Sequence, residues 1–530
     1  MVPSRPSKPN ILLITSDQHR GDCYGFEGRS VKTPHLDRMA ANGTRFSACI
    51  TPAVFCQPAR ASILTGLLPY THGVADNGIN LDPALGEAGF AGTLAKAGYD
   101  TAFIGKAHFS TRATFNPTES PECNSGSQTY GDDWCGPYMG FEHVELIVHG
   151  HLNKARGATK PPIGQHYERF FDSRGAENEA ATLWGTELPP HTGAGQTWHS
   201  ALPAQWHSST WIGDRTIDWL TRHQDKTTGN GRNGGNSDDP FCMWVSFPDP
   251  HHAFDCPEPW SRLHHPDSVE LPDHRTMDLD RRPWWHEASL TGEPIVDDPE
   301  IRRYRMKGQR VPPQTDEQLR DMTANYYGMI SLIDHNVGRI LDTLKATGAD
   351  QNTIVIFTSD HGDLLGDHGF YLKGPTLYEG VLRVGMLVQG PGIPAGQIIT
   401  DPVSTLDLTP SFCDLAGLSV PGQLQGQSLL PLINGATGAG REVAYNEWFV
   451  HKSRMGTDLD LRAVRTKTHK CTFEMISGAG ELYDLVNDPT EMNNLFADSG
   501  SVSIRKALEE MMHARPGPRL EQFSPQIGMA

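Results

Sequence analysis

One cysteine in this 530-residue chain stands where the surrounding sequence would activate it. In the stretch VFCQPARASILTG, residues 54–66, Pro58 suits the first turn of a helix and Gly66 the position just past its end. We therefore expect Cys56 at the helix N-terminus and Arg60, four residues later, on the same face. Exposed backbone N–H groups and a nearby cation lower the pKa of a thiol, which predicts a reactive side chain. The alternative is a small buried apolar residue, the usual role of a free cysteine.

Polar residues also follow four apolar runs that have strand character. Residues 10–15 are followed by Asp17, Gln18 and His19; 101–104 by Lys106 and His108; 241–247 by Asp249, His251 and His252; and 353–358 by Asp360 and His361. Helical patterns between the runs, such as 324–346, predict an α/β fold with a large, mostly parallel sheet flanked by helices. Ligands of such sheets bind outside the carboxyl ends of the strands, so we expect the four clusters to meet at one edge.

The residue types in these clusters point to metal and anion chemistry. Each residue alone also fits a helix cap, a turn or a solvated charge, but their shared placement at strand ends favours a site. Oxygen and imidazole ligands for calcium, magnesium or manganese are available from Asp17, Gln18, Asp360 and His361. Fixed positive charge for an anionic substrate would come from Arg60, Lys106 and Lys373, and proton transfer from His108 and His251.

Composition narrows the class of protein. A formal net charge of −18 argues against nucleic acid and anionic membranes as general partners. The N-terminus lacks the apolar core of a signal peptide, and no segment offers the roughly 18 uninterrupted apolar residues of a membrane span. Nine cysteines without CxxC pairs fit a reducing compartment. These features predict a cytoplasmic protein.

At this point the sequence resembles a type I sulfatase of the alkaline phosphatase superfamily. CQPAR matches the C-x-P-x-R signature of that family, continued by LTG at 64–66 and P-x-x-H-G at 69–73. GYDTAFIGKAHF resembles the second signature, SDHGDLLGDHGFYLKGPTLYE the metal and lysine segment, and ELYDLVNDPTEMNNL the C-terminal segment. The resemblance is weakest between residues 110 and 239.

The resemblance implies a role for each site residue. Cys56 would be oxidised by a separate formylglycine-generating enzyme and would also lie at the metal, which is calcium or manganese. One hydroxyl of the hydrated aldehyde, near Arg60 and Lys106, would attack sulfur and form a covalent sulfo-enzyme. His251, helped by Lys373, would protonate the leaving oxygen, and His108 would deprotonate the second hydroxyl. Asn77 matches an asparagine that contacts the substrate, although a structural turn residue is nearly as good an interpretation.

Two positions depart from the commonest pattern of the family, because Gln18 replaces an aspartate and His361 an asparagine. Both replacements also occur in choline sulfatases and phosphonate monoester hydrolases. The leading hypothesis is hydrolysis of an aryl or other small organic sulfate, which GKAH favours. The alternatives are a phosphonate monoester hydrolase or phosphodiesterase with the same machinery, and a sulfate- or glycan-binding protein whose Cys56 stays unmodified.

The chain is expected to divide into a catalytic domain over 1–435, a smaller α+β domain over 436–515 and a tail over 516–530. We expect the tail to cross to a neighbouring subunit, with a dimer as the default assembly. Ten of the eleven tryptophans lie between Trp134 and Trp285. They either pack in the interior, the commoner use of tryptophan, or line the substrate pocket. Residues 227–239 are predicted to form a surface loop. The basic residues of the small domain either border the substrate cleft or form a solvated face: Arg462, Arg465, Lys467 and Lys470.

Overall fold

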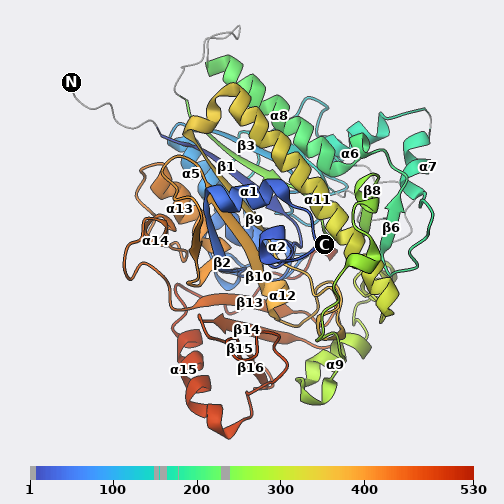
Figure 1. Ribbon diagram of the computed structural model, residues 1–530, viewed down its shortest axis with the longest axis vertical. Coiled ribbons are helices and arrows are strands. Elements are labelled where there is room, and N and C mark those ends of the chain that lie inside the picture. Colours follow the sequence, from blue (N-terminus) through green and yellow to red (C-terminus); the bar gives the residue numbers. More distant parts are fainter. Residues whose placement is uncertain (1–7, 149–153, 155–163, 177, 228–238, 530) are drawn as a thin grey trace.

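Nine strands form the central sheet of the protein, a computed structural model that describes residues 8–148, 154, 164–176, 178–227 and 239–529 (Figure 1). The strand order is β11-β2-β10-β9-β1-β7-β3-β5, and β12 also pairs with β2. The neighbours from β9 to β5 run parallel, whereas β10 is antiparallel to both β9 and β2. The bounds are β1 Asn10–Ser16, β2 Thr44–Ile50, β3 Asp100–Gly105, β5 His143–Leu146, β7 Phe241–Ser246, β9 Thr353–Ser359, β10 Arg383–Gln389, β11 Gln397–Ile399 and β12 Val403–Ser404. The predicted mostly parallel sheet and its four named strands are therefore confirmed.

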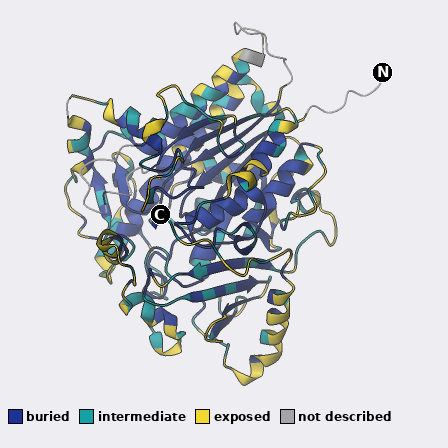
Figure 2. Cartoon of the chain, turned by 180° about the vertical axis from the view of Figure 1, so that it is seen from behind, coloured by how far each residue is buried: buried dark blue, intermediate teal, exposed yellow. Residues whose placement is uncertain are grey.

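Alternation along each central strand supplies apolar side chains to both faces of the sheet. In β1, Ile11 and Leu13 belong to one apolar cluster and Leu12 and Ile14 to another. The first cluster includes residues of α2 (Cys56–Thr65), α5 (Phe90–Lys96) and α13 (Leu408–Leu415). The second includes residues of α1 (Pro34–Asn42), α8 (Ser208–Thr227) and α11 (Asp316–Thr347), and α8 and α11 lie side by side (Figure 1). Helices thus cover both faces, and Figure 2 shows the strands buried between them.

Shorter elements complete the large domain. The helices are α3 Pro69–His72, α4 Pro83–Glu87, α6 His166–Asp172, α7 Glu179–Gly185, α9 Trp284–Thr291, α10 Pro299–Lys307, α12 Glu379–Leu382 and α14 Leu430–Ile433. A small parallel pair joins β6 (Thr197–Ser200) and β8 (Phe254–Pro257). The predicted helix over 324–346 is the core of α11. Of the predicted surface loop, residues 228–238 lie outside the described residues, as do residues 1–7 at the N-terminus.

A four-stranded antiparallel sheet follows the large domain in the chain. Its strands are β13 Ala444–Val450, β14 Leu459–Arg465, β15 His469–Glu474 and β16 Gly480–Asp484, and α15 Val502–His513 packs on one face. This arrangement confirms a smaller C-terminal domain with helix and strand. The boundaries at 435/436 and 515/516 stay predictions.

The C-terminal tail folds back onto its own chain. The Leu520 N–H donates to the Tyr70 carbonyl at 2.7 Å, and the Ile527 N–H donates to the Gly78 carbonyl at 2.8 Å. At its end, β17 (Gly528–Met529) pairs with β4 (Ala113–Thr114). The prediction that the tail crosses to a neighbouring subunit is therefore wrong, because this chain's own backbone provides the pairing edge.

The length and apolar character of the helices bear on whether the chain could cross a membrane. Among the residues that the structure describes, no helix combines the length and the apolar character needed to cross a bilayer.

Candidate active site

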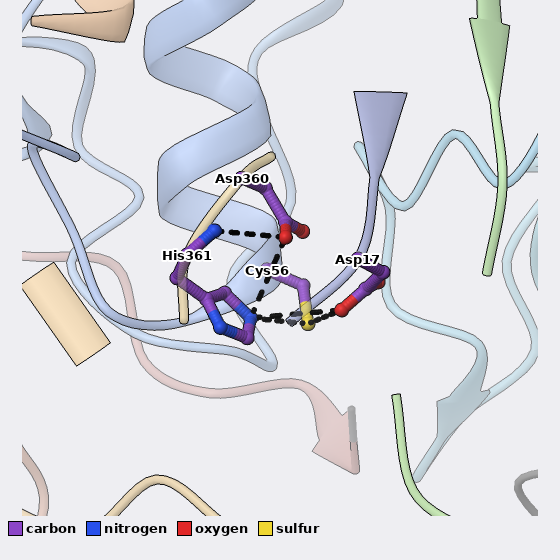
Figure 3. A group of neighbouring side chains, drawn as sticks. All are labelled: Asp17, Cys56, Asp360 and His361. Atoms are coloured by element: carbon purple, nitrogen blue, oxygen red, sulfur yellow. Dashed lines mark hydrogen bonds and ion pairs between the residues drawn. The ribbon is translucent and has the colours of Figure 1, made fainter. Parts of the chain in front are cut away.

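Helix α2 places Cys56 at the centre of the residues that follow the strands. Cys56 is its first residue, and Gly66 ends it in the left-handed conformation at φ 69°, as the sequence predicted. The Cys56 Sγ lies 3.3 Å from His361 Nε2 and 3.6 Å from an Asp17 carboxylate oxygen (Figure 3). It also lies 3.2 Å from the Lys373 Nζ. Residues from three separate segments thus converge on one sulfur atom.

The surrounding charges act on the Cys56 thiol. Burial and the Asp17 carboxylate raise its pKa, but the cations Lys106, Lys373 and His361 outweigh them and lower the pKa to about 7. Lys106 Nζ lies 3.7 Å from the sulfur and also pairs with Asp17. The electrostatic setting therefore favours negative charge on this side chain, as expected of a reactive residue.

Four buried side chains form a possible metal centre. Ligand atoms of Asp17, Cys56, Asp360 and His361 all lie within 4.8 Å of one another. His361 Nδ1 faces the Gly362 carbonyl at 2.9 Å and must donate to it, which leaves Nε2 turned toward the cluster. The pKa of Asp17 lies well below its ordinary value because Lys106 and Arg60 overcome the effect of burial, so Asp17 is ionised.

Gln18 completes this cluster. Its backbone N–H donates to Asp360 at 3.0 Å, its Nε2 donates to Asp363, and Nε2 lies 3.2 Å from the His252 Nδ1. The Gln18 Oε1 is buried and has no hydrogen-bond partner among the described residues. A buried acceptor without a partner costs free energy unless a ligand satisfies it. The donor set, mostly oxygen with one imidazole and one sulfur, therefore fits a divalent cation, as predicted.

Arg60 holds the two carboxylates of the cluster rather than facing the substrate space. Its side chain is fully buried, and its Nε donates to Asp360 at 2.9 Å while its Nη2 donates to Asp17 at 3.2 Å. A third donor, Nη1, bonds the Ser246 hydroxyl at 2.7 Å. Arg60 is not among the residues that line the cavity described next. Its charge acts on the substrate through the carboxylates it orients.

A cavity of about 750 Å³ opens onto Cys56 and contains the predicted proton carriers. His108, His251, Lys373 and Asn77 line it, whereas Lys106 does not. Both ring nitrogens of His108 are buried without a hydrogen-bond partner among the described residues. Burial, followed by Arg112 and Lys106, lowers the pKa of His108 well below its ordinary value. His108 is therefore a neutral imidazole that is able to accept a proton.

His251 and Asn77 are held by backbone groups. His251 Nδ1 faces the carbonyl of His252, and burial, Lys373 and His252 depress the pKa of His251. His251 is thus neutral until an anion binds nearby and raises its pKa, a condition for its predicted role as an acid. Asn77 Oδ1 accepts the backbone N–H of Gln57 at 3.0 Å, which gives this residue a structural role at the start of α2.

Several residues near the site were missed by the sequence analysis. Glu122 accepts the backbone N–H groups of His108, Phe109 and Ser110 and so fixes the loop that carries His108. No motif marks this glutamate. His252 also lines the cavity, and its place beside His251 in the sequence was the available signal.

The tryptophans follow the packing interpretation and not the pocket interpretation, and both interpretations of the basic residues of the small domain are wrong. No tryptophan between Trp134 and Trp285 is among the described lining residues, because these side chains pack elsewhere, as Trp184, Trp244 and Trp285 do in the core. The aromatic walls are instead Phe55, Tyr304, Phe370, Tyr371 and Trp448. The basic residues of the small domain neither line this cavity nor form a solvated face, since most are paired: Arg462 with Asp460, Arg465 with Glu379, and buried Lys470 with Glu491.

Comparison with known proteins agrees with this geometry. The sequence profile described as Sulfatase matches residues 9–418, and the profile described as N-sulphoglucosamine sulphohydrolase, C-terminal, matches residues 366–516. An arylsulfatase of Clostridium perfringens is 29% identical over 500 residues, covering 92% of this chain and 90% of the relative. A choline-sulfatase of Rhizobium meliloti is 28% identical over 494 residues, covering 92% and 82%.

Solved structures show the same fold. The phosphonate monoester hydrolase of Agrobacterium radiobacter superposes with a TM-score of 0.70 at 25% identity, covering 96% of this chain and 95% of that one. Proteins of the sulfatase family generally use a metal ion and a modified cysteine, and the cluster around Cys56 has residues for both. The chain belongs to the sulfatase family and is an arylsulfatase-like sulfuric ester hydrolase of the alkaline phosphatase superfamily.

Proposed function

We propose that the protein hydrolyses a sulfate monoester of an aryl or other small organic alcohol, with formylglycine made from Cys56 as the nucleophile. The observation that supports this most directly is the position of Cys56. It is the first residue of α2, its Sγ lies 3.2 Å from the Lys373 Nζ, and it lines the cavity. The Clostridium perfringens relative, which aligns over 92% of this chain, is also an arylsulfatase.

One divalent cation, calcium or manganese, is proposed to be held by Asp17, Gln18, Asp360, His361 and the modified Cys56. When bound, it would supply positive charge beside the nucleophile and the sulfate oxygens. The residues of the chain do the rest of the positioning. Arg60 orients Asp17 and Asp360 through its ion pairs, and Lys373 in the cavity lining offers its ammonium group to the sulfate oxygens. Lys106 pairs with Asp17 beside Cys56 and adds positive charge there.

The proposed reaction begins when one hydroxyl of the hydrated aldehyde at residue 56 releases its proton to solvent and its oxygen attacks sulfur. A new S–O bond to the enzyme forms while the S–O bond to the leaving alcohol breaks, giving a covalent sulfo-enzyme. His251, protonated once the anion has bound beside it, gives its proton to the leaving oxygen. Lys373 stabilises the negative charge that develops there.

The second half of the reaction needs a base, and we assign that role to His108, which lines the cavity and whose ring nitrogens have no partner among the described residues. Neutral His108 takes the proton of the second hydroxyl, the carbon–oxygen bond to sulfate breaks, and the aldehyde re-forms. Sulfate leaves and water hydrates the aldehyde for the next cycle. A serine in this position has no second hydroxyl and would leave a stable ester. An unmodified cysteine lacks that hydroxyl too, so the proposed mechanism requires the modification of Cys56.

Mass spectrometry of the Cys56 peptide tests this proposal. Protein from its native host should carry an aldehyde at residue 56, whereas the buried Cys49 in the same sample should keep its thiol and serves as the internal control. An intact thiol at both positions would refute the formylglycine mechanism and favour a binding protein. An intact Cys56 thiol would also argue against maturation by a formylglycine-generating enzyme.

A second candidate is phosphonate monoester or phosphate diester hydrolysis, favoured by the superposition on a phosphonate monoester hydrolase at a TM-score of 0.70. A sulfate monoester, a phosphonate monoester and a phosphate diester each carry one negative charge at neutral pH, and a phosphate monoester nearly two. Four such substrates with one shared aryl leaving group should be compared under the same metal and pH. We expect the highest kcat/KM for the sulfate. A phosphonate that outruns it by more than about tenfold, roughly 1.4 kcal/mol, would make the second candidate the function.

A further inference from the structure

The cavity above Cys56 differs in charge from the rest of the molecule. The chain has 63 acidic and 45 basic residues, yet all charged residues among the described lining are basic. They are Arg112, Arg305, Lys307, Arg310, Lys373 and Arg454. A concave surface with one sign of charge concentrates ligands of the opposite sign. One sulfate group placed at Cys56 would contact only the cations beside it.

Two of these cations are gathered around one neutral atom. Arg305 Nη1 and Arg454 Nη1 both donate to the Gln309 Oε1, at 2.7 and 3.0 Å. Arg454 also makes a two-point ion pair with Asp76, at 2.6 and 2.7 Å, and its guanidinium stacks 4.3 Å from the ring of Phe55, the residue before Cys56. Arg454 is therefore already neutralised by Asp76.

Arg310 extends this positive wall. Its guanidinium donates to the backbone carbonyls of Leu290 and Gly292, and no carboxylate of the described residues lies within 4.0 Å of it. Burial lowers the pKa of Arg310, with Glu293 opposing that effect only from a distance. A guanidinium held in place by carbonyls and lacking a counter-ion is suited to a ligand carboxylate or sulfate.

The remaining walls are apolar. Tyr304, Met306, Val311, Phe370 and Tyr371 line the same cavity. We propose that the natural substrate is a sulfate ester of an aromatic or similarly apolar alcohol that carries a second anionic group, bound by Arg310, and that cationic esters are rejected. This inference rests on the proposed sulfatase function, and it separates this chain from its choline-sulfatase relative, since choline is a cation.

Three 4-nitrophenyl sulfates test the inference. Each carries a CH₂ group attached to the aromatic ring, and this CH₂ group bears a carboxylate, a trimethylammonium group or a tert-butyl group. The tert-butyl group is neutral and has the shape of trimethylammonium. At low ionic strength we expect kcat/KM for the carboxylate ester to exceed that of the neutral ester by at least about tenfold, and the cationic ester to fall at least about tenfold below it. Salt should shrink both ratios. Equal kcat/KM for the three esters, or preference for the cation, would overturn the inference.

Variants assign the preference to the wall. Arg310→Gln should lower the carboxylate-to-ammonium ratio by about tenfold, and Arg310→Lys should keep most of it. Arg303→Gln is the matched control, because Arg303 lies at the middle of α10 with its side chain exposed, pairs with Glu300 at 2.7 Å and does not line the cavity. Lys307→Gln, at an exposed position, gives a second test if Arg310→Gln does not fold. An unchanged ratio in Arg310→Gln, or in Lys307→Gln where Arg310→Gln does not fold, would refute the role of this wall.

The design separates this inference from the proposed function. If no sulfate ester is hydrolysed but a phosphonate monoester is, the sulfatase proposal fails while the charge series can be repeated with phosphonates of the same three phenols. Preference for the carboxylate there supports the anionic wall, and its absence overturns it.

Discussion

Replacing His108 by alanine separates the two halves of the proposed reaction. His108 lines the cavity, is 1% exposed, and its ring nitrogens bond no described group. Its depressed pKa, caused by burial, Arg112 and Lys106, keeps it neutral at pH 7. It is therefore ready to take a proton from residue 56, and its removal leaves the metal cluster and Lys373 intact.

The expected effect differs between the steps. A positioned base contributes about 10²–10⁴-fold, so release of sulfate from the sulfo-enzyme should slow by that factor in His108→Ala. Attack on sulfur does not use this base and should change by less than about tenfold. The variant should then release about one equivalent of phenol per modified active site and nearly stop.

Stopped-flow measurement with 4-nitrophenyl sulfate reads out this burst directly. Mass spectrometry of the quenched variant should find the SO₃ adduct on the peptide that contains residue 56. His264→Ala is a suitable control, because His264 is also a buried histidine but bonds Ser331 away from the cavity. Its kinetics should match those of the wild type. A His108→Ala enzyme with no burst and an unchanged steady-state rate would refute the assignment.

Three further predictions concern stability. Arg60→Met leaves the carboxylates of the metal cluster buried without their cation, so the metal-free protein should lose about 3–5 kcal/mol in urea unfolding, and a loss below ~1 kcal/mol would contradict the ion-pair account. Burial and Arg515 lower the pKa of His72 to about 3, below the unfolded value of 6.5. The unfolded state therefore binds more protons below pH 6.5, and lowering the pH to 5 should cost about 2 kcal/mol through His72, a slope that His72→Gln should remove. Gln526→Ala breaks hydrogen bonds of 3.1 and 2.8 Å from the tail to Asp76 and the Asn77 carbonyl, and should lower stability by about 1–3 kcal/mol; equal unfolding midpoints would show that the tail does not brace this loop.

The central sheet was predictable because its signal is local. Apolar runs such as 353–358 are long enough to be strands, and each ends in a polar cluster, so order along the chain and the rule for parallel sheets suffice to bring Asp17 and Asp360 together. The helix after Cys56 was predictable for the same reason, since Pro58 and Gly66 mark its ends.

The walls of the cavity depend on contacts that no local pattern encodes. Arg310 and Tyr304 belong to a segment without any motif, and they reach the cavity only because that segment packs over it. The tryptophans failed as markers because large aromatic side chains are used first for burial, as Trp244 is in the core. The tail was misplaced because an extended segment pairs with any free edge, and β4 of the same chain offers one.

The balance of charge around Cys56 explains why a strongly acidic chain can bind an anion. Two carboxylates, Asp17 and Asp360, face three permanent cations, Arg60, Lys106 and Lys373, so the site is positive even before a divalent ion is added. Arg60 is buried behind the two carboxylates and pairs with both, so that the ammonium group of Lys373 remains available on the cavity side. A monoanion with a developing charge on its leaving oxygen suits this field, because the charge to be stabilised appears beside groups already fixed in place. The net charge of −18 is carried elsewhere on the molecule and does not oppose binding at short range, since salt screens it over about 8–10 Å.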